Sequence, residues 1–253
     1  MRVLVVIPAR HASTRFPGKP LALLAGKPIV QWVWERTSTI EGITAAVVAT
    51  DDERIVRCVE GFGGNAMMTS SSHRSGTDRC AEVMETLREK GEEFDIVINM
   101  QGDEPFVQPN QIENLISCFN QEETQIATLR TPIRSEEELF SPNNVKVVCS
   151  IDGKALYFSR YPLPYMRGVE YCEWHRRHKY YKHVGIYAFR SETLRTLAKL
   201  PYGELEQCES LEQLRWLEQG FTIQLGMSDA SNIGIDTPED LREAEKQIKT
   251  LAL

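Results

Sequence analysis

The sequence contains no long hydrophobic run. Near its start, the apolar stretch covers only residues 3–7, far fewer than a membrane-spanning helix or the apolar part of a signal peptide needs. The six cysteines are scattered, and no two of them have the CxxC spacing of a metal or redox site. We therefore expect a cytoplasmic protein with free thiols and with no membrane partner.

Internal repeats, low-complexity segments and convincing linkers are also absent from the sequence. Hydrophobic residues make up 42% of the chain and charged residues 26%, as in ordinary globular proteins. A chain of 253 residues is long enough to bury a substantial core. The sequence thus predicts a single domain over residues 1–253.

Acidic residues are missing from the first 34 residues, although the whole chain has a net charge of −7. This segment holds five Lys or Arg. Three of them, Arg10, Arg15 and Lys19, follow an apolar strand expected over residues 3–8. Arg offers a planar fork to phosphate oxygens, and Lys adds a mobile point charge. A cationic loop on an acidic protein favours a small polyanion over a nucleic acid, the alternative being a solvated basic loop.

Two common phosphate-binding motifs are absent from this loop. It has neither the Walker A pattern nor GxGxxG, so a P-loop NTPase and a dinucleotide-dependent dehydrogenase lose their main support. The hydroxyls of Ser13 and Thr14 can hydrogen-bond to an anion, and Gly18 lets the backbone approach it closely. We expect the loop to bind phosphates with its own side chains and N–H groups.

Strands and helices alternate over the first 120 residues. Strands are expected over residues 45–50 and 95–100, with helices after Asp52, from Ser75 to about residue 90, and over residues 109–119. Ser75 and Asp78 have the spacing of a capping box. This alternation predicts a mostly parallel sheet with helices on both faces, and such sheets bind ligands beyond the carboxyl ends of their strands.

The pattern changes after residue 126. Residues 145–150 and 155–158, joined by an Asp-Gly turn, predict a β-hairpin. We therefore expect a smaller β-rich lobe at about residues 126–190. The C-terminal part returns to the earlier rhythm, with a strand over residues 221–225 and a helix over residues 238–249.

Two aspartates follow apolar stretches and lie in loops. A site for Mg²⁺ uses one or two carboxylates and completes its shell with water and substrate phosphates, so Asp103 and Asp236 are candidate ligands. On the residues alone, Asp103 equally fits a turn and Asp236 a cap of the helix that begins at Pro238. Both interpretations remain open at this point.

Several motifs resemble one known family, the 3-deoxy-manno-octulosonate (Kdo) cytidylyltransferases, also called CMP-Kdo synthetases. The signature is Pro8-Ala9-Arg10 followed by residues 13–19. Further similar segments appear in family order and span nearly the whole chain. They are residues 73–79, 101–105, 155–160, 183–187 and 234–241.

The resemblance implies a three-layer αβα nucleotidyltransferase fold with a mostly parallel central sheet and a smaller β-rich dimerisation lobe. It implies transfer of CMP from CTP to the anomeric hydroxyl of Kdo, giving CMP-Kdo and pyrophosphate for lipopolysaccharide synthesis. It further implies Mg²⁺ on Asp103 and Asp236, and a homodimer. Arg10, Arg15 and Lys19 would neutralise the triphosphate charge as catalytic residues.

The family also supplies expectations for both substrates, CTP and an acidic eight-carbon sugar. Arg160 suits the sugar carboxylate, and Glu212 and Gln213 suit its hydroxyls. The implied nucleotide-binding residues are Pro8, Ala9, Arg10, Ser13, Arg15, Lys19, Ser75, Gly76 and Arg79. The implied sugar-binding residues are Gln101, Arg160, His183, Tyr187, Glu212 and Gln213.

Other functions stay open beside this one. The sugar could be the 8-amino derivative of Kdo or a sialic acid, or the chain could bind nucleotides without catalysis. Residues 165–182 combine aromatic and basic residues, a mixture that can bind single-stranded nucleic acid. His175 and His178 lack a third metal ligand nearby. We expect instead an exposed loop that forms a dimer contact, and no nucleic-acid partner.

Overall fold

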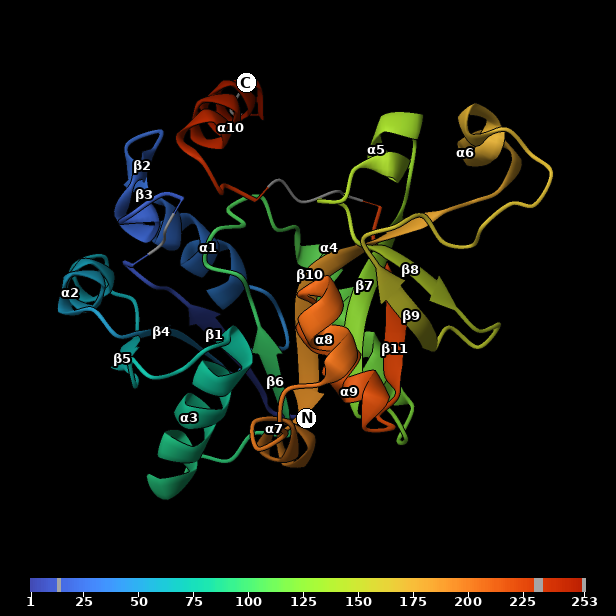
Figure 1. Cartoon of the computed structure of the whole chain (residues 1–253). Coiled ribbons are helices and arrows are strands. Elements are labelled where there is room, and N and C mark those ends of the chain that lie inside the picture. The colour runs from blue at the N-terminus through green and yellow to red at the C-terminus, as the bar shows by residue number, and fades with distance from the viewer. Residues whose placement is uncertain (13–14, 230–233, 252–253) are drawn as a thin grey trace. The chain divides into compact units, whose positions relative to one another are not determined.

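The chain divides into two units in the computed structural model, which describes residues 1–12, 15–229 and 234–251. One unit comprises Met1–Pro109 and Asn232–Leu253, and the other comprises Asn110–Ser231 (Figure 1). The lobe expected at about residues 126–190 lies inside the second unit. No helix among the described residues is long and apolar enough to cross a membrane.

A parallel sheet forms the centre of the first unit. Its strand order is β6 (Ile96–Asn99), β1 (Val3–Pro8), β4 (Ala45–Thr50) and β5 (Ala66–Met68). Val6 pairs with Val47 on one side and with Asn99 on the other. Residues 3–7 of β1 are almost fully buried, as expected for a central parallel strand.

Side-chain caps fix where the helices of this unit begin. Asp52 accepts a hydrogen bond from the Arg54 N–H and caps α2 (Glu53–Gly61). Ser75 and Asp78 form the predicted capping box at the start of α3 (Gly76–Glu89), with bonds of 3.1 and 3.3 Å. These bonds satisfy N–H groups that have no partner within a helix.

The remaining elements of the first unit build a small core at one end. They are η1 (Lys19–Leu21), β2 (Leu23–Leu24), β3 (Lys27–Pro28), α1 (Ile29–Ser38) and α10 (Pro238–Leu251). Leu24 and Ile29 pack there with Phe106, Ile235 and Ala244. This packing ties the C-terminal helix to the N-terminal loop.

A second set of strands forms the sheet of the second unit. β10 (Tyr181–Arg190) pairs antiparallel with β7 (Ile126–Pro132), and β11 (Ile223–Met227) pairs parallel with β7. The predicted hairpin is present as β8 (Lys146–Cys149) and β9 (Ala155–Ser159), and β8 also pairs with β10. The register of β10 shifts between Val184 and Tyr187, which marks an irregularity in the strand.

Short helices complete this unit. They are α4 (Pro109–Ser117), η2 (Cys118–Asn120), α5 (Glu136–Phe140), η3 (Tyr171–Glu173), α6 (Trp174–Arg177), α7 (Ser191–Leu197), α8 (Glu204–Glu209) and α9 (Glu212–Glu218).

The expectation of an exposed loop over residues 165–182 is wrong for two aromatic residues. Trp174 and Tyr180 are 0% and 2% exposed and pack with Ile133 and Leu139. The Trp174 indole donates to the Val169 carbonyl at 3.0 Å, and the Tyr180 hydroxyl donates to the Pro164 carbonyl at 2.9 Å. Because their polar groups have partners, these large rings can form a core of their own.

The fold class is the predicted one. The chain is a mixed α/β protein with a mostly parallel sheet, helices around it and an antiparallel β8–β9 pair (Figure 1).

Candidate active site

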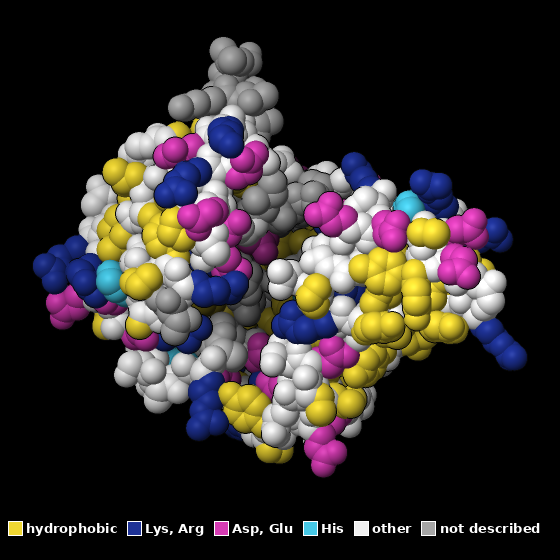
Figure 2. All heavy atoms as spheres, turned by 45° about the horizontal axis from the view of Figure 1, so that its top comes forward, with side chains coloured by type: hydrophobic (Ala, Val, Ile, Leu, Met, Phe, Trp, Pro, Cys, Tyr) yellow, Lys and Arg dark blue, Asp and Glu magenta, His cyan; other side chains and the backbone are white. Residues whose placement is uncertain are grey.

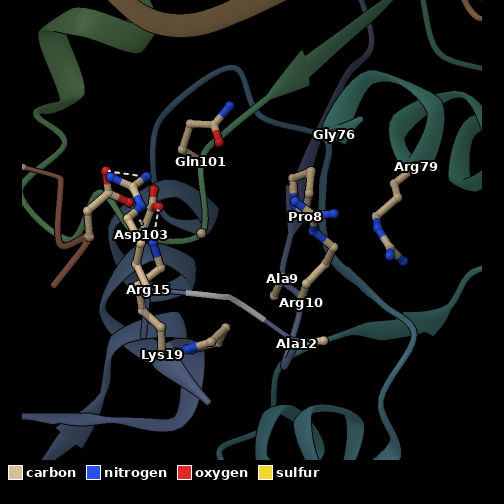
Figure 3. A pocket seen from close by; sticks show the side chains of 13 residues that line it. Pro8, Ala9, Arg10, Ala12, Arg15, Lys19, Gly76, Arg79, Gln101 and Asp103 are labelled. Carbon is tan, nitrogen blue, oxygen red and sulfur yellow. Dashed lines mark hydrogen bonds and ion pairs between the residues drawn. The ribbon is translucent and has the colours of Figure 1, made fainter. Parts of the chain in front are cut away.

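A pocket of about 410 Å³ opens in the first unit, beyond the carboxyl ends of β1 and β6. Figure 3 shows Arg15, Lys19 and Asp103 on one side of this pocket and Gly76 and Arg79 on the other. Its position agrees with the general rule for open parallel sheets. The lining residues are Pro8, Ala9, Arg10, Ala12, Arg15, Lys19, Pro20, Gly76, Arg79, Gln101, Gly102, Asp103 and Asp236.

Lys19 lies against two carboxylates. Its Nζ is 2.5 Å from Oδ2 of Asp103 and 3.1 Å from Oδ1 of Asp236, and its side chain is 11% exposed. Burial on its own lowers the pKa of Lys19, but the charges and hydrogen bonds of Asp103 and Asp236 raise this pKa above its usual value. Lys19 is therefore a fully charged ammonium group at neutral pH.

Arg15 adds a second cation to the same carboxylates. Its Nη2 lies 3.0 Å from Oδ2 of Asp236, so this aspartate bridges Arg15 and Lys19. The cap of α10 belongs to other residues, since Asp240 accepts from the N–H of Asp236 and Thr237, and Thr237 accepts from the Asp240 N–H. The alternative that the Asp236 carboxylate caps this helix is thus wrong.

The two aspartates fit a divalent cation in one respect. Their oxygens converge on a single positive point, the Lys19 ammonium group, so the chain already places both carboxylates around one cation. No cluster of three or more His, Cys, Asp or Glu with metal-binding geometry is present in the described part of the chain. Two carboxylates are enough for Mg²⁺ when water and phosphate oxygens supply the remaining ligands.

Arg79 is buried at the opposite side of the pocket. It is 1% exposed, and its guanidinium donates to Oδ2 of Asp51 at 2.6 Å and to Oγ1 of Thr69 at 2.6 Å. These bonds hold Arg79 in one position and neutralise its charge. Arg79 therefore lines the pocket with a side chain whose position is fixed.

Two glycines allow the loops around Pro8 to approach one another. A Cβ on Gly102 would lie 2.6 Å from the Pro8 carbonyl oxygen, closer than real side chains come. A Cβ on Gly76 would lie 3.2 Å from Nδ2 of Asn99 and 3.3 Å from Cγ of Pro8. The missing Cβ thus leaves room for the Pro8 backbone at Gly102, and for the side chains of Asn99 and Pro8 at Gly76.

The second unit contains five of the predicted sugar-binding residues, with Arg160 at the end of β9. Its Nε donates to the Glu209 carbonyl at 2.7 Å, Nη1 to the Pro142 carbonyl at 3.0 Å and Nη2 to the Ser210 carbonyl at 3.3 Å. These three bonds fix the guanidinium, and it has no ionic partner among residues 1–12, 15–229 and 234–251.

His183 and Tyr187 lie together on β10. Their ring centroids are 5.1 Å apart, and Nε2 of His183 is 2.9 Å from Oγ1 of Thr128. Burial lowers the pKa of His183 to about 3, so its ring is neutral at neutral pH. Burial, with the charge of Glu212, raises the pKa of Tyr187 well above its usual value. The Tyr187 hydroxyl has no hydrogen-bond partner among the described residues.

Glu212 and Gln213 begin α9. Oε1 of Glu212 pairs with Nη2 of Arg215 at 2.8 Å, and Gln213 is only 5% exposed. The charge of Glu212 reaches β10, because it contributes to the raised pKa of Tyr187. Gln101, the remaining member of the predicted sugar set, lines the pocket of the first unit.

Comparisons with known proteins place this geometry in one family. Residues 4–225 match the model of a family described as cytidylyltransferase. A 3-deoxy-manno-octulosonate cytidylyltransferase of Parabacteroides distasonis is 50% identical over 248 residues, which cover 96% of this chain and 97% of that protein. This chain belongs to the 3-deoxy-manno-octulosonate cytidylyltransferase family.

A solved structure supports the same family assignment. It is a CMP:2-keto-3-deoxy-manno-octonic acid synthetase complexed with CTP, with a TM-score of 0.91 and 42% identity, and the match covers 99% of this chain and 100% of that one. An 8-amino-3,8-dideoxy-manno-octulosonate cytidylyltransferase of Shewanella sp. is 46% identical over 250 residues, covering 98% of this chain and 99% of that protein.

Within this cytidylyltransferase, the structure gathers most of the predicted nucleotide-binding residues in the pocket. Ser75 caps α3 beside the pocket-lining Gly76, and Ser13 lies outside the described residues. Sequence reasoning missed the lining residues Ala12, Pro20 and Gly102. Gly102 lies between two predicted site residues, Gln101 and Asp103, so a glycine in the loop after a buried strand was the available signal.

Proposed function

We propose that this chain transfers the cytidylyl group of CTP to the anomeric hydroxyl of Kdo. The sugar oxygen attacks the α-phosphorus, the bond from this phosphorus to the bridging oxygen of pyrophosphate breaks, and CMP-Kdo and pyrophosphate result. The observation that carries the proposal is the pocket beyond β1 and β6, where cations and two aspartates converge in a chain of this family.

The charges of the pocket suit a triphosphate. Four cationic side chains and two carboxylates line it, although the chain as a whole is acidic. Lys19, Arg10 and Arg15 would neutralise phosphate oxygens, and the charge that develops on pyrophosphate during transfer gives these groups their catalytic effect. Arg79, whose charge is paired with Asp51, would shape the site.

Asp103 and Asp236 would hold Mg²⁺ in this proposal. The ion would supply positive charge that orients the α-phosphate and lowers the pKa of an attacking hydroxyl. Lys19 pairs with both carboxylates, so its ammonium group lies beside the oxygens that would hold the ion. From this position it would add positive charge next to the bound phosphates.

The second unit would recognise the sugar. Arg160, bound to three neutral carbonyls, suits the carboxylate of Kdo. The hydroxyl of Tyr187, which has no partner in the described part of the chain, suits a sugar hydroxyl. The neutral ring of His183 can donate or accept a single hydrogen bond without adding charge.

One assay tests the reaction. Pyrophosphate release from CTP is measured with Kdo, with its 8-amino analogue, with a sialic acid and without sugar, each with and without Mg²⁺, and the product is identified by mass. We expect release that depends on both Kdo and Mg²⁺, with CMP-Kdo as the product. Release that needs no sugar, or no release with any of the three, would overturn the proposal.

The 8-amino sugar is a second candidate substrate. The observation that favours it is the Shewanella relative, which is almost as similar to this chain as the Parabacteroides one. A kcat/KM for the amino sugar above that for Kdo in the same assay would make it the substrate.

A homodimer formed by the second unit is also part of the proposal. Tyr161, Tyr165 and Tyr171 are 58%, 63% and 51% exposed, and such large exposed aromatics favour an interface. Figure 2 shows hydrophobic side chains gathered on the right of the view, in the part of the molecule that carries α6 and the β8–β9 hairpin. Light scattering should give twice the chain mass, and Tyr165→Lys should shift it toward one chain mass.

The proposed location is the cytoplasm. All six cysteines are free thiols, a state typical of reducing compartments. Fractionation of cells that make the protein should recover it with cytoplasmic markers.

A further inference from the structure

Arg160 is held firmly but is not neutralised. Its three hydrogen bonds run to neutral carbonyl oxygens of Pro142, Glu209 and Ser210. No carboxylate of the described residues forms an ion pair with it. A guanidinium has five donors, so two remain for an anion. Arg160 therefore keeps both its full charge and part of its hydrogen-bonding capacity.

The side chain of Glu209 contacts the same strand end. Its Oε1 accepts from Oγ of Ser159 at 2.6 Å, and its Oε2 accepts from the backbone N–H of Arg160 at 2.8 Å. The side chain of Arg160 thus binds the backbone at Glu209, while the side chain of Glu209 binds the backbone at Arg160. This reciprocal pair joins the end of β9 to the end of α8.

The backbone next to Glu209 has an unusual conformation. Ser210 has φ of 52°, in the left-handed region, and directs its carbonyl to Nη2 of Arg160. Such a conformation is unfavourable for a non-glycine residue and persists where neighbouring contacts hold it. Leu211 follows and is the N-cap of α9. The position of this turn therefore sets where Glu212 and Gln213 begin the helix.

The charge of the Glu209 carboxylate also acts on a second cation, Lys146. Lys146 on β8 is buried and donates to the Ser141 carbonyl at 2.9 Å, next to the Pro142 carbonyl that Arg160 binds. Burial lowers the pKa of Lys146 to about 8, the charge of Glu209 opposes this shift, and the charge of Arg160 adds to it. The Glu209 carboxylate thus acts on the pKa of Lys146, while its own hydrogen bonds run to the Ser159 hydroxyl and the backbone N–H of Arg160.

We propose that Glu209 is a positioning residue of the sugar site, which orients Arg160 and the start of α9 while leaving the guanidinium charge free for the carboxylate of an acidic sugar. This inference rests on the proposed function, because it assigns Arg160 to that carboxylate. A carboxylate in direct contact with the guanidinium would compete with the substrate, and binding through the backbone avoids this competition.

The test compares Glu209→Gln and Glu209→Ala with the matched control Glu204→Gln, which changes an exposed glutamate of the same helix. We expect KM for the acidic sugar to rise about tenfold in Glu209→Ala and less in Glu209→Gln, with kcat and KM for CTP within about twofold. Glu204→Gln should match the wild type.

A sugar with its carboxylate converted to the amide separates positioning from general damage. Glu209→Ala should raise KM for the acid but change KM for the amide little, because only the acid uses the Arg160 charge. An equal rise for acid and amide, or an unchanged KM for both, would overturn the proposal. Glu209→Gln, which keeps the side-chain volume, carries the same comparison if Glu209→Ala fails to fold.

A second readout does not depend on catalysis. The Nε–Hε signal of Arg160, assigned by its loss in Arg160→Lys, reports the bond to the Glu209 carbonyl by its exchange with water. We expect faster exchange in Glu209→Ala than in the wild type and in Glu204→Gln. Unchanged exchange would overturn the positioning role even if the wild type transfers CMP. A third outcome is possible, in which the wild type shows no sugar-dependent activity but Glu209→Ala still shows faster exchange. This outcome would overturn the proposed function and the assignment of Arg160 to the sugar, although it would support the contact between Glu209 and Arg160.

Discussion

The two units hold their candidate functional cations in opposite ways. In the first unit, Lys19 and Arg15 form ion pairs with the carboxylates of Asp103 and Asp236. In the second unit, Arg160 binds three backbone carbonyls, and its charge has no opposite partner in the described part of the chain.

This difference separates two ways of binding an anion. Ion pairs between side chains can exchange partners when a phosphate or a divalent cation arrives, because each charged group accepts any partner of opposite charge. A guanidinium fixed by carbonyls keeps its position and presents an unchanged charge. The first arrangement suits a site whose charges move during a reaction, and the second suits recognition of one fixed carboxylate.

Removing a carboxylate from the first site should have the largest effect. Asp103→Asn keeps the shape but loses the charge that Lys19 and the proposed metal ion share, so we expect turnover to fall by about 100-fold or more. Steady-state rates at saturating CTP measure this. Asp152→Asn, which changes an exposed aspartate of the β8–β9 turn, is the control. A normal rate for Asp103→Asn at limiting Mg²⁺ would contradict the metal assignment.

Lys19 tests whether a mobile cation acts mainly during the reaction. Lys19→Ala should lower single-turnover rates by about 100-fold while the Kd for CTP rises less than about tenfold, because Arg10 and Arg15 still bind the phosphates. Lys19→Arg should restore only part of the rate, since a planar fork does not replace a compact charge. Abolished CTP binding with normal chemistry at saturation would make Lys19 a binding residue only.

Arg160 tests the fixed charge of the second unit. Arg160→Ala should raise KM for Kdo by about 10–100-fold, the effect of a lost charge-assisted pair, and leave KM for CTP unchanged. Arg167→Ala, at an exposed arginine of the same unit, should change neither constant. Equal weakening of both substrates would remove Arg160 from the sugar site.

The smallest expected effect concerns stability, through the pH dependence that the buried His183 gives to unfolding. Its pKa is about 3 in the folded chain, against an ordinary value of 6.5, so the unfolded chain binds more protons between these two values. The free energy of unfolding should therefore decrease as the pH falls from 6.5 toward 3. For one histidine, the equilibrium constant of unfolding should rise by at most about tenfold per pH unit.

Urea unfolding at several pH values measures this dependence. The decrease should be smaller in His183→Gln, and the exposed His178→Gln should behave as the wild type. The same pH dependence in all three proteins would show that burial of His183 does not lower its pKa.

Local signals in the sequence predicted much of the first unit. The capping box of Ser75 and Asp78, the apolar run of β1 and the aspartate before α2 are each determined by neighbours in the chain, and all three are present. The β8–β9 hairpin was predictable for the same reason, because its turn residues are adjacent.

Contacts between distant segments were not predictable in this way. The register shift in β10 and the burial of Trp174 depend on packing against other strands and helices. Likewise, the bonds that join Arg160 to Glu209 connect residues 49 positions apart, and no spacing rule covers them. Asp103 and Asp236 were predicted as loop carboxylates that could share a metal ion, but their direct contact with Lys19 joins segments far apart in the sequence.

The close approach of the loops at Gly76 and Gly102 has a consequence for how this pocket can evolve. Most binding sites change their preference by exchanging one side chain for a larger or smaller one. At these two positions there is no side chain to exchange, and even a methyl group on Gly102 would meet the backbone of Pro8. At Gly102 the wall can change only if the backbone at Pro8 moves, so this position should accept substitutions less readily than a lining side chain such as Gln101.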